Sequence, residues 1–210
     1  MFDNFEKIPD EKKEIIIRAS LEEFAEKGYE RASTNTITKK AGIPKGTLFY
    51  FFGSKKDLYY YILDYAVREI AKESRMHAPP LSPDLFERLL QRGMIKLGIA
   101  LKRPMLFEII YGSVINIPDN MKQEIRDKYK GFYSENQDGL YKGIDSSKFN
   151  NGIDLKKAAE IATIFLEGIL SRYMAEFKKS SASDALKMYE KISSKAREYF
   201  EILKKGIYKS

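Results

Sequence analysis

The sequence contains no cysteine and only one histidine, His77, in 210 residues. The lack of cysteine excludes disulfides, thiol catalysis and cysteine-based metal sites. His77 lies in the proline-rich segment HAPP, and a lone histidine leaves no set of side chains for zinc. Carboxylates such as Glu22 and Glu23 lie on charged helical faces, which are typical of solvated surfaces rather than of acid–base pairs. We therefore expect no catalytic residues, no metal, no cofactor and no enzyme activity.

The chain also lacks a long apolar run. Its longest near-apolar stretch, residues 161–170, is too short and too interrupted to span a bilayer. The opening segment MFDNFEKIPDEKK is too charged for a signal peptide. Hydrophobic residues make up 43% of the chain and aromatic residues 13%, which is enough for a substantial core. These features predict a soluble cytoplasmic protein with one large or two small domains and no membrane partner.

Acidic residues are missing from one stretch. From Arg31 to Lys56 there are six Lys or Arg residues and no Asp or Glu, although the chain has 30 acidic residues. The local charge of +6 is nearly all of the formal net charge of +7. Such a local excess is the footprint expected of a surface that meets phosphate groups. The alternative explanation is a general lysine-rich bias of the composition.

The same stretch carries the turn signals of two short helices. Ser33 or Thr34 can cap the first helix at its N-terminus, and Gly42 suits a left-handed stop at its end. Pro44 suits the first turn of a second helix, over about 44–51. Two short helices joined by a tight turn form a helix-turn-helix, whose second helix enters the major groove of DNA.

The rest of the chain shows helical periodicity, without a strand pattern or an internal repeat. After a frayed arm over residues 1–9, we expect further helices over about 10–27, 54–76, 82–104, 104–115, 118–141, 154–178 and 181–205, with a loop over 143–154. The predicted fold is all-α with about nine helices. Its predicted parts are a helix-turn-helix DNA-binding domain over residues 1–53 and a helical effector-binding and dimerisation domain over residues 54–210, with 54–76 as a connector.

The run FAEKGYERASTNTITKKAGIPKGTLFYFFGSKKDLYYYIL closely resembles the N-terminal domain of TetR-family transcriptional regulators. The resemblance covers roughly residues 10–62 and rests on Phe24, Gly28, Tyr29, Thr34, Ile37, Ala41, Gly42, Ile43, Lys45, Gly46, Thr47, Leu48, Phe52, Lys55 and Leu58. Two positions depart from the pattern of the family. Phe49 stands where Tyr is usual, so a hydroxyl that could reach a phosphate is missing. Thr38 stands where a small Ala is usual, but a helical Thr can bond back to its own backbone.

Helix geometry and the resemblance both place the DNA-reading surface on the exposed face of the second short helix. We expect DNA contacts from Thr34, Thr36, Lys45, Thr47, Tyr50 and Lys55. Lys45 can reach a base edge or a phosphate, and Thr47 can offer its methyl group to a thymine. The hydroxyls of the two earlier threonines suit phosphate contacts. For each lysine the alternative is a solvated surface charge, and for Tyr50 it is a place in the core.

One recognition helix specifies too few base pairs, because each base pair contributes only about 1–3 kcal/mol of discrimination. A symmetric dimer on a near-palindromic site solves this problem. The last two long helices carry more apolar surface than one chain needs, and the resemblance also implies a dimer through them. The predicted interface residues are Ala162, Ile169, Tyr173, Tyr189, Ala196, Tyr199 and Phe200. The alternative is that both helices are wholly internal.

The part of the chain between residues 80 and 180 is large for a dimer scaffold and resembles a ligand chamber. An apolar, aromatic pocket would suit a lipophilic or aromatic effector. The residues that could line it are Phe86, Leu90, Met94, Phe107, Tyr111, Phe132, Tyr133 and Phe165. The resemblance implies a repressor that releases its operator when the ligand binds. Two alternatives stay open: these residues fill a core, or a regulator of the same fold acts without a small effector, as an activator or under the control of a protein.

Overall fold

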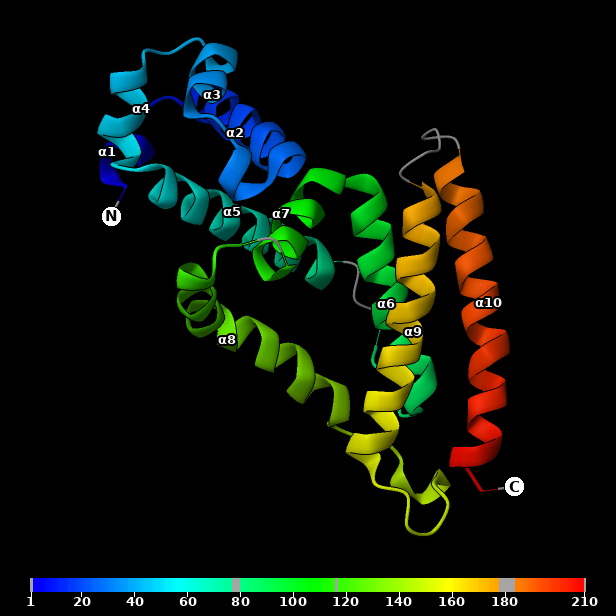
Figure 1. Cartoon of the computed structure of the whole chain (residues 1–210). Helices are drawn as coiled ribbons and strands as arrows, with labels where there is room; N and C mark the ends of the chain where they lie inside the picture. Colours follow the sequence, from blue (N-terminus) through cyan, green and yellow to red (C-terminus); the bar gives the residue numbers. More distant parts are fainter. Residues whose placement is uncertain (1, 77–79, 116, 178–183, 210) are drawn as a thin grey trace. The chain divides into compact units, whose positions relative to one another are not determined.

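The computed structural model describes residues 2–76, 80–115, 117–177 and 184–209, without the side chains of 114–115, 131–139, 173–177 and 184–186 (Figure 1). In these residues the fold is all-α, as predicted, with ten α-helices, a short 3-10 helix over Ser146–Lys148, and no strand. The α-helices are α1 (Asp3–Glu6), α2 (Asp10–Arg31), α3 (Thr34–Ala41), α4 (Lys45–Phe52), α5 (Lys55–Met76), α6 (Leu85–Lys102), α7 (Pro104–Ile115), α8 (Asp119–Tyr141), α9 (Leu155–Phe177) and α10 (Asp184–Ile207). None of these helices, as far as they are described, is both long and apolar enough to cross a membrane.

Local signals explain several features of the helices. Gly28 interrupts α2 with a φ of 69°, which is a left-handed value that favours glycine. The start of α6 is capped by Asp84, whose carboxylate accepts from the N–H groups of Phe86 at 3.0 Å and Glu87 at 3.1 Å. Asp154 accepts from the N–H of Lys157 at 2.9 Å and caps α9 in the same way. The start of the last helix, expected at residue 181, lies outside the described residues.

The predicted frayed arm over residues 1–9 is wrong, because this segment contains α1. Phe5 of α1 is fully buried, and its ring centroid lies 4.6 Å from that of Phe52 and 5.1 Å from that of Tyr61. The Tyr61 hydroxyl also donates to Glu6 Oε1 at 2.9 Å. A helix of four residues is unstable alone, so these contacts with α4 and α5 hold it in place.

The described chain packs as two compact units. Unit 1 comprises Met1–Glu73 and Arg103–Tyr129, and unit 2 comprises Ser74–Lys102 and Lys130–Ser210. In unit 1, α2 packs against α3 and α7, and α5 shares one core with α1–α4. No break in packing therefore coincides with the domain boundary expected at residue 53. That boundary stays a prediction about how the functions are divided.

Unit 2 is built on the mutual packing of α6, α9 and α10, which lie side by side in Figure 1. A Cβ atom on Gly93 of α6 would lie 2.6 Å from Leu166 Cδ2, so α6 and α9 approach closely at this glycine. Arg88 of α6 is 2% exposed. Its guanidinium donates to three carbonyl oxygens, those of Ser82 at 2.7 Å, Leu140 at 3.0 Å and Lys142 at 2.6 Å. Arg88 thus satisfies carbonyl groups at the C-terminal end of α8.

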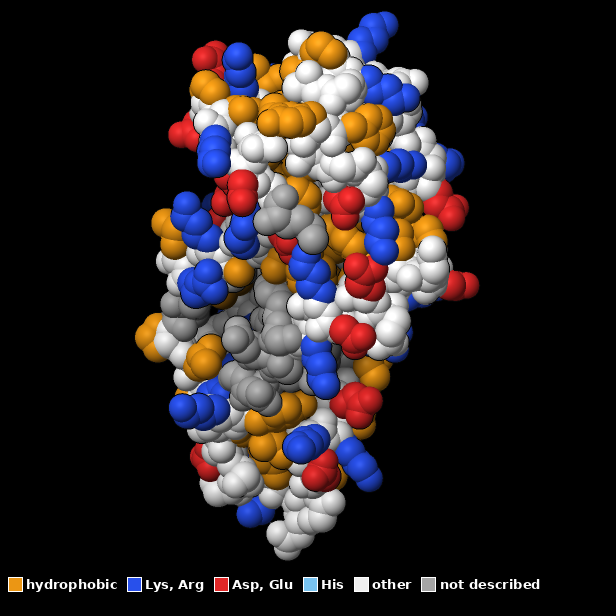
Figure 2. All heavy atoms as spheres, turned by 90° about the vertical axis from the view of Figure 1, so that its left-hand side faces the viewer, with side chains coloured by type: hydrophobic (Ala, Val, Ile, Leu, Met, Phe, Trp, Pro, Cys, Tyr) orange, Lys and Arg blue, Asp and Glu red, His pale blue; other side chains and the backbone are white. Residues whose placement is uncertain are grey.

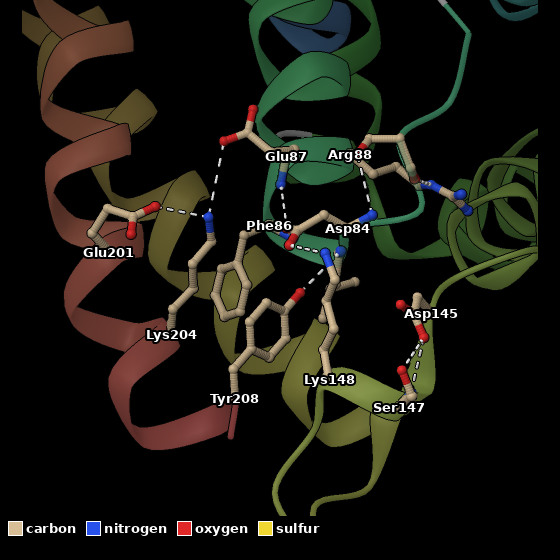
Figure 3. Close-up of polar contacts among 12 residues, drawn as sticks. Asp84, Phe86, Glu87, Arg88, Asp145, Ser147, Lys148, Glu201, Lys204 and Tyr208 are labelled. Carbon is tan, nitrogen blue, oxygen red and sulfur yellow. Dashed lines mark hydrogen bonds and ion pairs between the residues drawn. The ribbon is translucent and has the colours of Figure 1, made fainter. Parts of the chain in front are cut away.

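The C-terminal residues of the described chain return to the start of α6 (Figure 3). The Tyr208 hydroxyl accepts from the Leu85 N–H at 3.2 Å, and the Tyr208 ring packs edge-on against Phe86 at 5.3 Å and Phe149 at 5.1 Å. Lys148 Nζ lies 3.4 Å from the carboxylate of Asp84. These contacts close one end of unit 2 around the α6 cap.

Candidate nucleic-acid interface

The predicted helix-turn-helix is formed by α3, a turn and α4. Ser33 is the N-terminal cap of α3, and its hydroxyl accepts from the Thr36 N–H at 3.4 Å. Gly42 ends α3 in the left-handed conformation, with a φ of 66° and a ψ of 30°. The Thr38 hydroxyl donates to the Asn35 carbonyl at 3.0 Å, which is the local backbone bond expected of a threonine in place of alanine.

A buried carboxylate supports the start of α3. Glu23 of α2 is 4% exposed, and its Oε1 accepts from the Ser33 N–H at 2.9 Å. The expectation that Glu23 lies on a solvated face is wrong. The spacing of Glu23 from Ile16 and Ser20, seven and three residues earlier, places it on the buried side of α2 and was the available signal. Glu23 therefore fixes the start of α3, the first helix of the helix-turn-helix, against α2.

The predicted reading face of α4 is exposed. Lys45 is exposed, Thr47 is half-buried, and the side chain of Tyr50 is 67% exposed. Leu48 and Phe52 face the core at 1% and 3% exposure. The alternative that Tyr50 is a core aromatic is therefore wrong, because Tyr50 lies on the side of α4 away from Leu48.

The other predicted DNA contacts are less open. Thr34 and Thr36 are half-buried in the first turn of α3. Lys55 is held within unit 1: its Nζ donates to the Glu30 carbonyl at 2.9 Å and lies 5.0 Å from the centre of the Tyr29 ring. Burial lowers the pKa of Lys55, while the charge of Glu23 and that of Glu30 oppose this shift. Lys55 must give up its bond to Glu30 before it can bind a phosphate with all three N–H groups.

Carboxylates from other helices reach the acid-free stretch. Lys40 pairs with Glu22 of α2 at 3.2 Å, and Lys56 pairs with Glu124 of α8 at 2.7 Å. Because these ion pairs neutralise Lys40 and Lys56, the positively charged surface is smaller than the six Lys and Arg residues of the stretch suggest. In Figure 2, hydrophobic side chains lie exposed between Lys and Arg side chains in the upper part of the view, over the region of α3 and α4.

The predicted effector residues are divided between the two units. Phe86, Leu90 and Met94 are buried in the core of unit 2, against α9 and α10, because they form the apolar stripe of α6. Phe165 is half-buried beside the same core. Phe107 is half-buried and Tyr111 is 50% exposed, and both belong to α7 in unit 1. The side chains of Phe132 and Tyr133 lie outside the described residues.

A surface hollow of about 380 Å³ lies elsewhere, in unit 1. It is lined by Glu22, Ala25, Glu26, Lys40, Pro104, Met105 and Glu108, none of which belongs to the predicted pocket. In the described part of the chain, no three His, Asp or Glu side chains lie close enough together to hold a metal ion.

The predicted interface residues lie largely within the chain's own core. Ala162 and Ile169 of α9 and Ala196 and Phe200 of α10 are buried in unit 2. Tyr189 and Tyr199 are half-buried, and the side chain of Tyr173 is not among those described. Among the described side chains of these two helices, the large apolar ones that are exposed are others, namely Ile161 at 53%, Ile164 at 62% and Ile202 at 60%. A dimer through α9 and α10 would have to use these outer sides.

Known DNA-binding regulators are similar to this chain, both in the helix-turn-helix region and over most of its length. Residues 16–62 match the model of the tetR family of bacterial regulatory proteins. The chain is 23% identical over 198 residues to the uncharacterised HTH-type transcriptional regulator YvdT of Bacillus subtilis, with 93% of this chain and 95% of that protein covered. It is 22% identical over 152 residues to the fatty acid metabolism regulator protein of the same organism, with 70% and 75% covered.

A solved structure shows a similar fold over nearly the whole chain. It is that of a TetR family transcriptional regulator from Chloroflexus aurantiacus, with a TM-score of 0.71, 22% identity, and 99% of this chain and 98% of that chain covered. The matched family model spans α3, the turn and α4, including the exposed face of α4. The similar proteins are regulators and not enzymes. Residues 16–62 thus match the DNA-binding domain of the tetR family of bacterial regulatory proteins, and the whole chain shares the fold of a TetR-family transcriptional regulator.

Proposed function

We propose that the protein is a cytoplasmic repressor that binds a near-palindromic operator as a homodimer and leaves it when a small lipophilic or aromatic ligand binds. The observation that carries the DNA-reading part is the exposed face of α4, with Lys45, Thr47 and Tyr50 on a helix whose other side is buried. An exposed tyrosine beside an exposed lysine suits a DNA surface, because the phenol can donate to a phosphate while the ammonium neutralises one.

Each residue of this face has a distinct role in the proposal. Lys45, at the first position of α4, reaches a base edge or a phosphate. Its ammonium lies 5.9 Å from the centre of the Phe49 ring, so Phe49 supports Lys45 although it has no hydroxyl of its own. Thr47 contacts a thymine methyl group, and Thr34 and Thr36 bind phosphate at the N-terminus of α3.

The effector class is suggested by a relative. The protein that covers 70% of this chain at 22% identity is a fatty acid metabolism regulator, so a fatty acid or its derivative is the first ligand to test. A ligand that binds one arrangement of the body more tightly shifts the population toward that arrangement. Release of DNA follows if that arrangement no longer fits both half-sites of the operator.

Selection of bound sequences from random duplex DNA tests this function. The expected result is an inverted repeat, with binding that weakens steeply as salt increases. Recovery of no enriched sequence, with binding lost at moderate salt, would mean that the basic stretch gives only non-specific attraction.

A second candidate function uses the same DNA surface without a small effector, either as an activator or under the control of a protein. Phe86, Leu90 and Met94 are buried in the hydrophobic core of unit 2, as this second function expects of them. Loss of operator binding on addition of a fatty acid or an acyl thioester distinguishes the first function from the second.

A further inference from the structure

The short helix α1 packs directly against α4, the second helix of the helix-turn-helix. In the described chain, α1 and α3 are the helices whose backbones follow α4 most closely, and Figure 1 shows α1 beside α4 in unit 1. The matched family model covers residues 16–62, so α1 lies outside it. This chain therefore supports α4 with a segment that the family model does not include.

Phe5 is the centre of this contact. Its side chain is fully buried, and its ring centroid lies 4.6 Å from that of Phe52 and 5.6 Å from that of Phe51. Phe2 contacts the same helix, with its ring centroid 5.6 Å from that of Phe52. Phe51 and Phe52 are the last two residues of α4. The aromatic side chains before and within α1 thus pack against the C-terminal turn of α4.

This contact is linked to the exposed face of α4 through one residue. Phe51 is half-buried, and its ring centroid lies 5.6 Å from that of Phe5 and 5.8 Å from that of Tyr50. Tyr50 is the side chain expected to donate to a phosphate. Protein interiors are close-packed, so loss of the Phe5 ring would let Phe51 and the end of α4 shift toward the space it leaves.

The helix α1 is also anchored to α5. The Tyr61 hydroxyl donates to Glu6 Oε1 at 2.9 Å, and the Tyr61 ring centroid lies 5.1 Å from that of Phe5 and 5.3 Å from that of Phe52. Burial and the hydrogen bond to Glu6 raise the pKa of Tyr61 to about 12, so the hydroxyl keeps its proton at neutral pH. The segment α1 therefore joins the end of α4 to α5.

A helix as short as α4 depends on such contacts for its direction. It has eight residues, and isolated helices of this length are unstable in water. The start of α4 follows α3 after the turn at Gly42, and α3 is fixed on α2 by the hydrogen bond from the Ser33 N–H to Glu23. The direction of α4 is therefore set by α3 at its start and by α1 and α5 at its end.

We propose that Phe5 is a positioning residue for DNA reading, whose aromatic contacts hold α4 in the direction at which Lys45 and Thr47 meet base edges. This inference rests on the proposed function, because it assumes that α4 lies in the major groove. Non-specific attraction needs only positive charges near phosphates, whereas contacts with bases need a fixed helix direction. Loss of the Phe5 ring should therefore lower the affinity for the operator more than the affinity for unrelated DNA.

The test compares the whole wild-type protein with Phe5→Ala and Phe5→Leu. The matched controls are Phe149→Ala and Phe149→Leu, because Phe149 is also buried, at 6% exposure, but belongs to the core of unit 2. Equilibrium affinities are measured for the selected operator and for a duplex of unrelated sequence, at a temperature where circular dichroism shows each variant to be folded. The readout is the ratio of the two affinities, since a variant that only lowers the folded fraction weakens both by the same factor.

Phe5→Ala should lower the ratio of the two affinities about tenfold, the scale of one lost base contact. Phe5→Leu keeps much of the apolar volume and should lower the ratio less. Both Phe149 variants should keep the ratio of the wild type. An unchanged ratio in Phe5→Ala, or an equal fall in Phe149→Ala, would overturn the positioning role.

Amide hydrogen exchange of the free proteins gives a second readout that does not depend on DNA. The amides of α4 should exchange faster in both Phe5 variants than in wild type, because local opening becomes easier there. The amides of α3 should not, because Glu23 and α2 hold α3 in place. Equal protection of α4 in wild type and in both variants would also overturn the proposal. If Phe5→Ala does not fold, Phe5→Leu supplies both readouts.

The proposed function is tested separately, by selection of bound sequences with the wild-type protein. If no inverted repeat is recovered, the operator-reading function falls, and the positioning role falls with it. If an inverted repeat is recovered and the ratio of affinities is unchanged in Phe5→Ala, the function stands and only the role of Phe5 falls.

Discussion

Tyr50 and Leu48 show how sharply exposure changes around α4. Tyr50 is 67% exposed, whereas Leu48, two residues earlier, is 1% exposed. Truncation of such an exposed side chain usually changes the free energy of unfolding by less than about 0.5 kcal/mol. An effect of Tyr50 on DNA binding can therefore be measured without loss of the fold.

The first prediction concerns Tyr50→Ala. We expect the affinity for the selected operator to fall about tenfold, the scale of one charge-assisted hydrogen bond to phosphate, with the unfolding midpoint in urea unchanged. Tyr50→Phe is the matched control for the ring. If Phe restores the affinity, the ring binds rather than the hydroxyl, and if Ala retains full affinity, Tyr50 is not part of the reading surface.

The second prediction concerns Glu23, which accepts from the Ser33 N–H at 2.9 Å while only 4% exposed. Glu23→Ala leaves this N–H without its acceptor, so the free energy of unfolding should fall by about 1–3 kcal/mol. Glu23→Gln keeps an acceptor oxygen and should lose less. Denaturation in urea measures both changes. The exposed neighbour Glu26→Ala is the control, and an equally large loss there would remove the special role of Glu23.

At the scale of helices, local signals made most of the fold predictable. Gly42 ends α3, and Asp84 and Asp154 cap α6 and α9, because each signal acts within a few residues of the end that it sets. The small helix α1 was missed for the opposite reason. Phe5 is buried by Phe52 and Tyr61, which lie far along the chain from it. The sequence of residues 1–9 alone therefore could not reveal that this segment forms a helix.

The candidate sites were predictable to different degrees. The exposed face of α4 followed from periodicity, since exposed and buried positions lie on opposite sides of one short helix, while its contact with DNA stays a prediction. The apolar sides of α9 and α10 were also recognised, but periodicity does not show which partner covers an apolar side. Ala162 and Phe200 turn out to pack within unit 2, and the apolar stripe of α6 packs there too. Pocket and interface residues therefore could not be separated from core residues.

The third prediction concerns Arg88, which holds α6 to the end of α8. Arg88→Ala leaves three carbonyl oxygens without their donor and opens a cavity, so we expect a loss of unfolding free energy on the order of 3 kcal/mol. Chemical denaturation followed by circular dichroism gives the value. Arg197→Ala is the control, because its ion pair with Glu87 is exposed and should contribute less than about 1 kcal/mol. Equal losses in the two variants would contradict the capping role of Arg88.

For the whole molecule, binding of one operator by two identical helix-turn-helix domains requires an interface that joins two chains. Ile161 and Ile164 lie three residues apart on α9, at 53% and 62% exposure, and Ile202 on α10 is 60% exposed. The inner sides of these helices are already buried in unit 2. Exposed isoleucines at helical spacing on two neighbouring helices are suited to a symmetric contact with the same two helices of a second chain.

The fourth prediction is that Ile161→Asp combined with Ile164→Asp converts a dimer into a monomer. The fold should be retained, because both side chains are exposed in the single chain, whereas two desolvated carboxylates per chain would prevent a close apolar contact. Sedimentation equilibrium measures the mass, and operator binding should then lose its dependence on the second half-site. Ile153→Asp, at an exposed isoleucine before α9, is the control and should stay dimeric. A doubly substituted protein that still sediments as a dimer would place the interface on another surface. The two DNA-binding domains of the dimer would then have to be joined through elements other than α9.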